Sequence, residues 1–180
     1  MPKFREELLA ALSKKVCLLG EFAVGKTSLI RRFVYDRFDD KYISTIGVKV
    51  SRKSIVVPRE DDLIDLTMML WDLAGNEEFS EVRASYLRGS SGAVLVCDLT
   101  RKDTLEKLIN YVTDLRRVSP DAALIIAANK VDLINEHQLT VSDVKEAANK
   151  LEAPFHLTSA KDDDGVEELF RHIGKLLVGG

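Results

Sequence analysis

One eight-residue pattern restricts the fold of this chain more than any other feature. Residues 20–27 read Gly-Glu-Phe-Ala-Val-Gly-Lys-Thr, which matches G-x-x-x-x-G-K-[S/T]. An apolar run at 16–19 precedes the pattern and apolar residues at helical spacing follow it, so it joins a strand to a helix. The glycines let backbone N–H groups approach an anion, and the helix N-terminus adds unpaired donors. The pattern therefore predicts a phosphate-binding loop, in which Lys26 reaches the terminal phosphates and the Thr27 hydroxyl ligates Mg²⁺.

Composition excludes several classes of protein. The chain has 180 residues, of which 46% are hydrophobic and 31% charged, so a single globular domain with a substantial core is expected. The formal net charge of −3 gives no support for nucleic-acid binding. Cys17 and Cys97 each lie in an apolar run, which favours buried reduced thiols over a disulfide or a zinc site.

The sequence carries no signal for a membrane or a secretory pathway. No apolar run is long enough to span a bilayer, and the final Leu-Val-Gly-Gly lacks a C-terminal cysteine motif for prenylation. We therefore expect a cytoplasmic, monomeric protein without a membrane anchor in this chain. His137, His156 and His172 are isolated in the sequence, and their spacing predicts no metal site.

Hydrophobic patterning divides the chain into strands and helices. Residues 2–13 place apolar side chains on one helical face, so residues 1–13 are either a short N-terminal helix or a linker before a domain over 14–180. Strands are expected at 15–19, 48–57, 66–71, 93–97, 124–128 and 155–157. One helix follows the phosphate loop, and the capping-box pairs Asp103 with Glu106 and Thr140 with Asp143 predict the starts of two more. A last helix is expected over 166–177.

The connections between these strands predict the type of sheet. A charged turn at 58–62 joins two strands too briefly for a helical crossover, which predicts an antiparallel hairpin. The later strands are apolar throughout and alternate with amphipathic helices, as is typical of a parallel sheet covered on both faces. The expected architecture is α/β with three layers.

Polar residues follow these strands at the edge where ligands of such sheets bind. Asp72 ends an apolar strand and can hold a water of a Mg²⁺ shell, and Gly75 lets a backbone N–H approach a γ-phosphate. Residues 129–132 read Asn-Lys-Val-Asp. The Asp132 carboxylate can accept both N1–H and N2–H of guanine, whereas adenine lacks that pair of donors. Residues 159–161, Ser-Ala-Lys, can supply a backbone N–H to guanine O6.

Together these motifs resemble those of the small GTPases of the Ras superfamily over residues 14–178. Residues 42–48, Tyr-Ile-Ser-Thr-Ile-Gly-Val, and 71–75, Trp-Asp-Leu-Ala-Gly, are most similar to the Rab branch. The resemblance implies a P-loop NTPase three-layer sandwich. Its sheet has six mostly parallel strands with one antiparallel edge strand, and it has five helices.

The resemblance also implies a function and a set of site residues. The chain would be a switch that binds GTP or GDP with Mg²⁺ and contacts effector, exchange-factor and activating proteins through loops 36–47 and 73–86. The implied nucleotide-binding residues are Gly20, Glu21, Phe22, Ala23, Val24, Gly25, Lys26, Thr27, Ser28, Phe38, Thr45, Gly75, Asn129, Lys130, Asp132, Ser159, Ala160 and Lys161. The implied metal-binding residues are Thr27, Thr45 and Asp72, and the implied catalytic residues are Asn76, Lys26, Thr45 and Gly75.

Two positions depart from the family pattern. Asn76 stands where a glutamine usually orients the attacking water, and asparagine is shorter by about one carbon–carbon bond, ~1.5 Å. Misplacement of that size can cost on the order of 10²-fold in rate. Phe22 stands at a position of the phosphate loop that is often glycine. Its ring either crowds the γ-phosphate or folds outward without effect.

These departures leave three hypotheses. The chain is a slow GTPase, or it is a GTP-binding scaffold that does not hydrolyse GTP, and the two differ at Asn76 and Phe22. A P-loop kinase or ATPase is the third, and Asp132 argues against it because an adenine pocket does not need a carboxylate there.

Overall fold

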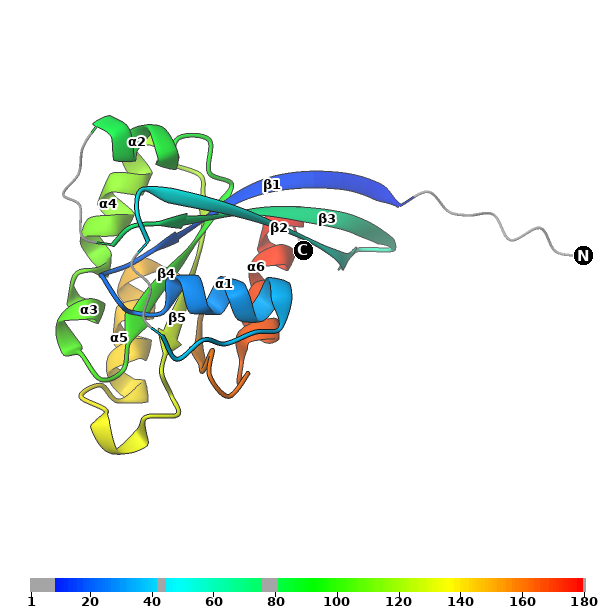
Figure 1. Cartoon of the computed structure of the whole chain (residues 1–180). Helices are drawn as coiled ribbons and strands as arrows, with labels where there is room; N and C mark the ends of the chain where they lie inside the picture. The colour runs from blue at the N-terminus through cyan, green and yellow to red at the C-terminus, as the bar shows by residue number, and fades with distance from the viewer. Residues whose placement is uncertain (1–8, 42–44, 76–80, 180) are drawn as a thin grey trace, which may run out of the picture.

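The structure is a computed structural model that describes residues 9–41, 45–75 and 81–179. Its centre is a six-stranded sheet with the strand order β2-β3-β1-β4-β5-β6 (Figure 1). The strands are β1 (Ala10–Leu19), β2 (Val48–Arg59), β3 (Asp62–Leu73), β4 (Gly92–Asp98), β5 (Ala123–Asn129) and β6 (Phe155–Thr158). Only the β2–β3 pair is antiparallel among these strands, and β2 lies at an edge of the sheet. The predicted mixed sheet is confirmed.

Helices connect the strands. They are α1 (Lys26–Tyr35), α2 (Glu81–Leu87), α3 (Lys102–Glu106), α4 (Leu108–Val118), α5 (Val141–Leu151) and α6 (Val166–Val178), with a 3₁₀ turn at Ile134–Glu136. Lys107 alone separates α3 from α4 and keeps right-handed helical dihedral angles. Counting α3 and α4 as one interrupted helix gives the five helices predicted, within the described residues.

Two apolar layers hold the helices on the two faces of the sheet. On one face, α1 and α6 pack together, and the rings of Phe33 and Phe170 stack with centroids 4.2 Å apart. On the other face, α2, α3, α4 and α5 bury residues such as Leu87, Leu108 and Val144 against the sheet. Because β4, β5 and residues 16–19 of β1 are covered on both sides, their sequences are apolar without alternation.

The N-terminal part of the chain differs from the expectation. Residues 10–14 extend β1 and pair with β3 from Ile64 to Met68, so a helix reaching residue 13 is wrong. The residues at 1–8 lie outside the described part. The β2–β3 hairpin is also longer than predicted, and its turn lies at Glu60, which has a φ of +52°. Because β1 pairs with β3 along this extension, the three strands β1, β2 and β3 project together beyond the rest of the sheet (Figure 1).

The two predicted capping boxes have different outcomes. Thr140 accepts a hydrogen bond from the Asp143 backbone and Asp143 accepts one in return, so this box is confirmed. The box at Asp103 is wrong, because α3 begins after Arg101 and has no side-chain cap. Thr104 instead bonds the backbone of Asp98 at the end of β4, a contact that local sequence does not reveal.

Candidate nucleotide-binding site

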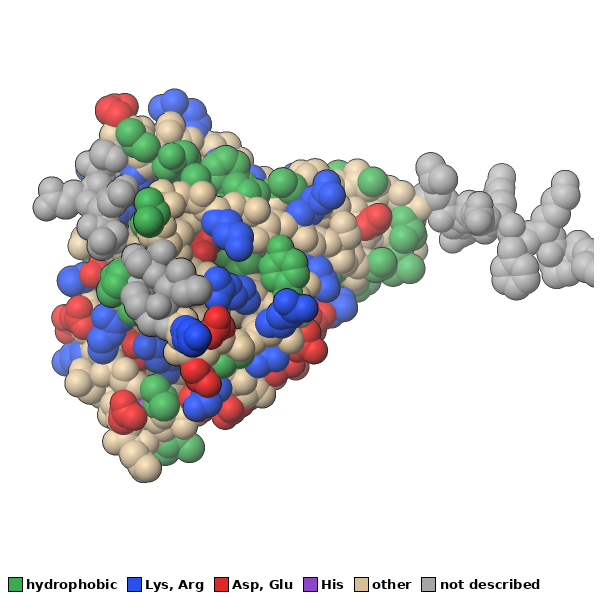
Figure 2. Space-filling model, viewed as in Figure 1, with side chains coloured by type: hydrophobic (Ala, Val, Ile, Leu, Met, Phe, Trp, Pro, Cys, Tyr) green, Lys and Arg blue, Asp and Glu red, His purple; other side chains and the backbone are tan. Residues whose placement is uncertain are grey.

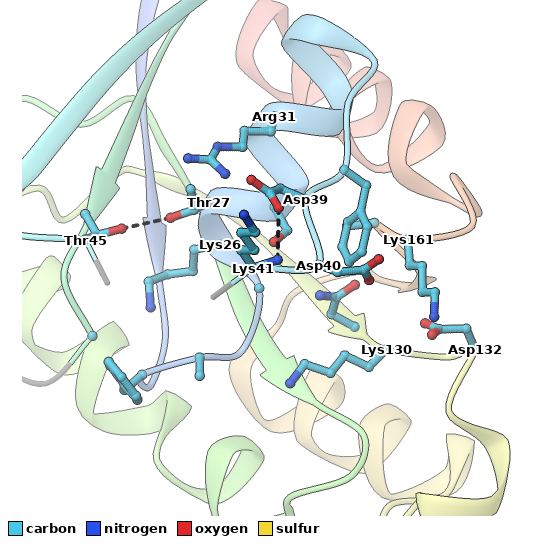
Figure 3. A pocket seen from close by; sticks show the side chains of 18 of the residues that line it. Lys26, Thr27, Arg31, Asp39, Asp40, Lys41, Thr45, Lys130, Asp132 and Lys161 are labelled. Atoms are coloured by element: carbon cyan, nitrogen blue, oxygen red, sulfur yellow. Dashed lines mark hydrogen bonds between the residues drawn. The ribbon is translucent and has the colours of Figure 1, made fainter. Parts of the chain in front are cut away.

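A cavity of about 340 Å³ opens at the carboxyl ends of β1, β3, β5 and β6. Its size falls in the range of small-molecule sites. Predicted site residues that line it are Phe22, Ala23, Gly25, Lys26, Thr27, Ser28, Phe38, Thr45, Gly75, Asn129, Lys130, Asp132, Ala160 and Lys161. In Figure 3, Thr27 and Thr45 lie at one end, and Asp132 and Lys161 lie at the other.

The phosphate loop requires glycine at two positions. Gly20 and Gly25 have φ angles of +151° and +106°. A Cβ on Gly20 would lie 2.2 Å from the Val96 carbonyl oxygen, and one on Gly25 would lie 2.2 Å from Asn129 Nδ2. The loop therefore follows its path only because both residues lack a side chain.

Lys26 lies under this loop and is held by it. Its Nζ donates to the carbonyl oxygens of Gly20 at 2.7 Å and Glu21 at 2.8 Å. Burial lowers the pKa of Lys26 to about 8, against the raising effect of Asp72 and Glu21. A bound phosphate would supply the negative charge that this buried ammonium group needs.

Three oxygen-bearing side chains meet beside Lys26. The Thr27 hydroxyl donates to Asp72 Oδ2 at 2.5 Å and lies 2.8 Å from the Thr45 hydroxyl, which is itself 3.5 Å from Asp72 Oδ2. Asp72 Oδ1 is buried and has no hydrogen-bond partner among the described residues. Burial raises the pKa of Asp72, against the lowering effect of the Thr27 hydrogen bond. This set of hard oxygen donors with one unsatisfied carboxylate oxygen fits Mg²⁺.

The opposite end of the cavity is built by the loops after β5 and β6. The Ser159 hydroxyl donates to Asp132 Oδ1 at 2.8 Å and orients that carboxylate. Asn129 is buried and donates from Nδ2 to the Val24 carbonyl at 3.0 Å, while its Oδ1 accepts from the Thr158 hydroxyl at 3.0 Å. Asn129 thus connects the phosphate loop to the end of β6, as its motif predicted.

Lys130 is fixed by a buried carboxylate. Its Nζ lies 2.6 Å from Asp98 Oδ2, and its backbone has a φ of +69°. Burial alone would raise the pKa of Asp98, but hydrogen bonds from Lys130 and Thr100 outweigh burial and lower it. Asp98 therefore stays ionised and holds the side chain of Lys130, which lines the cavity.

Some predicted residues lie behind the cavity. Gly20, Glu21, Val24, Asp72 and Ser159 do not line it, and the Glu21 carboxylate accepts a hydrogen bond from Tyr111 on α4. Asn76, predicted to orient the catalytic water, lies outside the described residues. Phe22 lines the cavity with 41% of its surface exposed.

Sequence reasoning missed four polar residues in the wall. Arg31, Asp39, Asp40 and Lys41 line the cavity (Figure 3). Arg31 comes from the second turn of α1, and the others come from the loop after it. The unpatterned sequence of 36–47 predicted a loop but gave no signal that its charged side chains face the cavity.

The histidines also differ from the expectation of isolated residues. His156 Nε2 on β6 lies 2.9 Å from His172 Nδ1 on α6, with the rings nearly perpendicular. Their separation in sequence concealed this contact. The pair lies away from the residues that line the cavity.

Comparison with known proteins identifies the family. The family model described as "Ras family" matches residues 15–178. The chain belongs to the Ras family. Ras-related protein Rab-22A of Homo sapiens is 38% identical over 168 residues, which cover 93% of this chain and 84% of that protein. Ras-related protein Rab-21 of Homo sapiens is 36% identical over 169 residues, which cover 93% of this chain and 73% of that protein.

These matches agree with the Rab-like motifs, so the chain is a Rab-like small GTPase of the Ras family. Ras family proteins are GTP-binding switches that use Mg²⁺. None of the helices within residues 9–41, 45–75 and 81–179 has the length and apolar character needed to cross a membrane. Acidic and basic side chains are interspersed on the face that Figure 2 shows, in keeping with the small net charge.

Proposed function

We propose that this chain is a GTP/GDP switch whose intrinsic hydrolysis of GTP is slow. The observation that carries the proposal is that one cavity joins a phosphate loop, a partly buried oxygen cluster and an oriented carboxylate. Each of these features matches one part of a guanine nucleotide with its metal ion. Lys26 would bind the terminal phosphates, and Asp132 would accept from the guanine edge.

The metal would be held by the oxygen cluster. Thr27 and Thr45 would be direct ligands and Asp72 would act through water, because Mg²⁺ keeps several waters in its octahedral shell. When bound, Mg²⁺ neutralises negative charge on the β- and γ-phosphates. Thr45 also belongs to loop 36–47, so its position would depend on whether a γ-phosphate is present.

Slow hydrolysis follows from two side chains. Asn76 keeps the amide of the usual glutamine but is one methylene shorter, so it would hold the attacking water less well. Phe22 is partly exposed in the wall of the cavity, and its carbonyl oxygen accepts a 2.6 Å hydrogen bond from Arg101. Since Phe22 lines the cavity, a second candidate function is a GTP-binding scaffold that does not hydrolyse GTP. Both versions would bind effector and regulatory proteins through loops 36–47 and 73–86.

Competition binding tests the nucleotide specificity that both versions share. The protein is loaded with fluorescent GDP in Mg²⁺ and challenged with GTP, GDP, ATP and ADP. We expect displacement by the guanine nucleotides and little by the adenine nucleotides, because adenine would leave the Asp132 carboxylate unpaired. Asp132→Asn should weaken the guanine preference. Displacement by ADP as effective as that by GDP would contradict the assignment.

A further inference from the structure

Tyr111 on α4 lies where three parts of the proposed switch meet. Its hydroxyl is 2.7 Å from Glu21 Oε1 in the phosphate loop and 3.1 Å from the Gly75 carbonyl oxygen after β3. The guanidinium of Arg83 on α2 lies 4.5 Å from the centre of the Tyr111 ring. The tyrosine is buried, with 6% of its surface exposed. It therefore contacts both Gly75 and Arg83, which flank residues 76–80 in sequence.

Gly75 is closely packed against the phosphate loop. A Cβ on Gly75 would lie 2.6 Å from the Gly20 carbonyl oxygen, from the Glu21 carbonyl carbon and from Lys26 Nζ. Gly75 thus lies next to the lysine that would bind the terminal phosphates. A displacement of Gly75 away from the loop would move its backbone N–H away from the γ-phosphate.

The Tyr111 hydroxyl has one proton for two acceptors. Burial raises the pKa of Tyr111, and Glu21 raises it further, so the hydroxyl remains a donor at physiological pH. Glu21 Oε2 also accepts from Lys107 Nζ at 3.0 Å, which fixes the carboxylate on the α4 side of the loop. The hydroxyl proton is shared between the Glu21 carboxylate and the Gly75 carbonyl in a three-centre hydrogen bond.

We propose that Tyr111 is a positioning residue that holds Gly75 against the phosphate loop in the triphosphate-bound state, with Glu21 orienting its hydroxyl. This inference rests on the proposed GTP/GDP function. Only GTP offers a γ-phosphate to the Gly75 N–H, so a contact that holds Gly75 in place stabilises the GTP-bound form more than the GDP-bound form. Tyr111 itself does not line the cavity.

The test compares affinities for a non-hydrolysable GTP analogue and for GDP in Tyr111→Phe. This variant keeps the ring against Arg83 and removes only the hydroxyl. We expect the ratio of analogue affinity to GDP affinity to fall about threefold to tenfold, which corresponds to one hydrogen bond. Glu21→Gln keeps an acceptor oxygen without the charge and should shift the ratio in the same direction by less. Tyr35→Phe is the matched control, because Tyr35 lies on α1 and is 54% exposed. In this variant the ratio of analogue affinity to GDP affinity should stay unchanged.

The outcomes separate this inference from the proposed function. An unchanged ratio in Tyr111→Phe, or equal losses for both nucleotides, would overturn the positioning role, because a merely structural tyrosine affects both states alike. If Tyr111→Phe does not fold, the ratio of analogue affinity to GDP affinity is measured in Glu21→Gln instead, and an unchanged ratio there would overturn the positioning role. Wild-type protein that binds neither guanine nucleotide would overturn the proposed function itself.

Discussion

Replacing Asn129 by alanine should both destabilise the fold and accelerate the release of GDP. The substitution removes the Nδ2 donor of the Val24 carbonyl and the acceptor of the Thr158 hydroxyl, and both of these partners are fully buried. Each buried polar group left unpaired costs about 1–3 kcal/mol. Since the hydroxyl can rotate toward another acceptor, we expect a loss of about 2–4 kcal/mol in the free energy of unfolding.

Urea unfolding of nucleotide-free protein measures this loss, with Thr158→Val as the matched control. Thr158→Val keeps the shape of the side chain and removes one of the two bonds, so it should cost about 1 kcal/mol. The loss in the double variant should be about 1 kcal/mol smaller than the sum of the two single-variant losses, because both substitutions remove the same hydrogen bond. GDP release from Asn129→Ala should accelerate by about tenfold or more, equivalent to ~1.4 kcal/mol. A change in unfolding free energy below about 0.5 kcal/mol would show that the two Asn129 hydrogen bonds do not stabilise the fold.

Three other substitutions test separate parts of the cavity. Gly75→Ala would place a Cβ 2.6 Å from backbone atoms of residues 20 and 21, so stopped-flow binding should show impaired association of a GTP analogue with GDP binding retained. Thr27→Ala removes a proposed metal ligand, so Mg²⁺ should bind at least about tenfold more weakly than in wild type. The Mg²⁺ concentration needed to slow GDP release measures this affinity. Burial lowers the pKa of Lys26 from 10.5 to about 8, so the free protein holds this lysine largely neutral at about pH 9 whereas bound phosphate restores its charge. Calorimetry in buffers of different ionisation enthalpy should therefore show uptake of about one proton on GDP binding at that pH, absent in Lys26→Met.

Motifs with a local cause were predictable from the sequence. The phosphate loop, Asp72 and residues 129–132 all lie at or directly after the carboxyl ends of apolar strands, and parallel strands necessarily bring these ends to one edge. The capping box of Thr140 and Asp143 was predicted correctly for the same reason, since both partners lie within one helical turn.

Features that depend on distant partners were not predictable. Residues 10–14 form a strand because they pair with β3, about fifty residues away, and not because of their own pattern. The His156–His172 contact joins β6 to α6, and the Glu21 side chain turns toward Tyr111, ninety positions further along the chain. Thr104 bonds Asp98 and so moves the start of α3 away from the expected cap.

Single-turnover hydrolysis of bound GTP, without partner proteins and at saturating Mg²⁺, tests the account most directly. We expect conversion to GDP that depends on Mg²⁺ and is no faster than the intrinsic Ras rate, on the order of 10⁻⁴ s⁻¹. Asn76→Gln should raise the rate with little change in GDP affinity. If Phe22 also obstructs the γ-phosphate, Asn76→Gln with Phe22→Gly should raise it more than the two single changes combined. A wild-type rate of the order of a partner-stimulated GTPase, or a double variant no faster than wild type, would contradict the account.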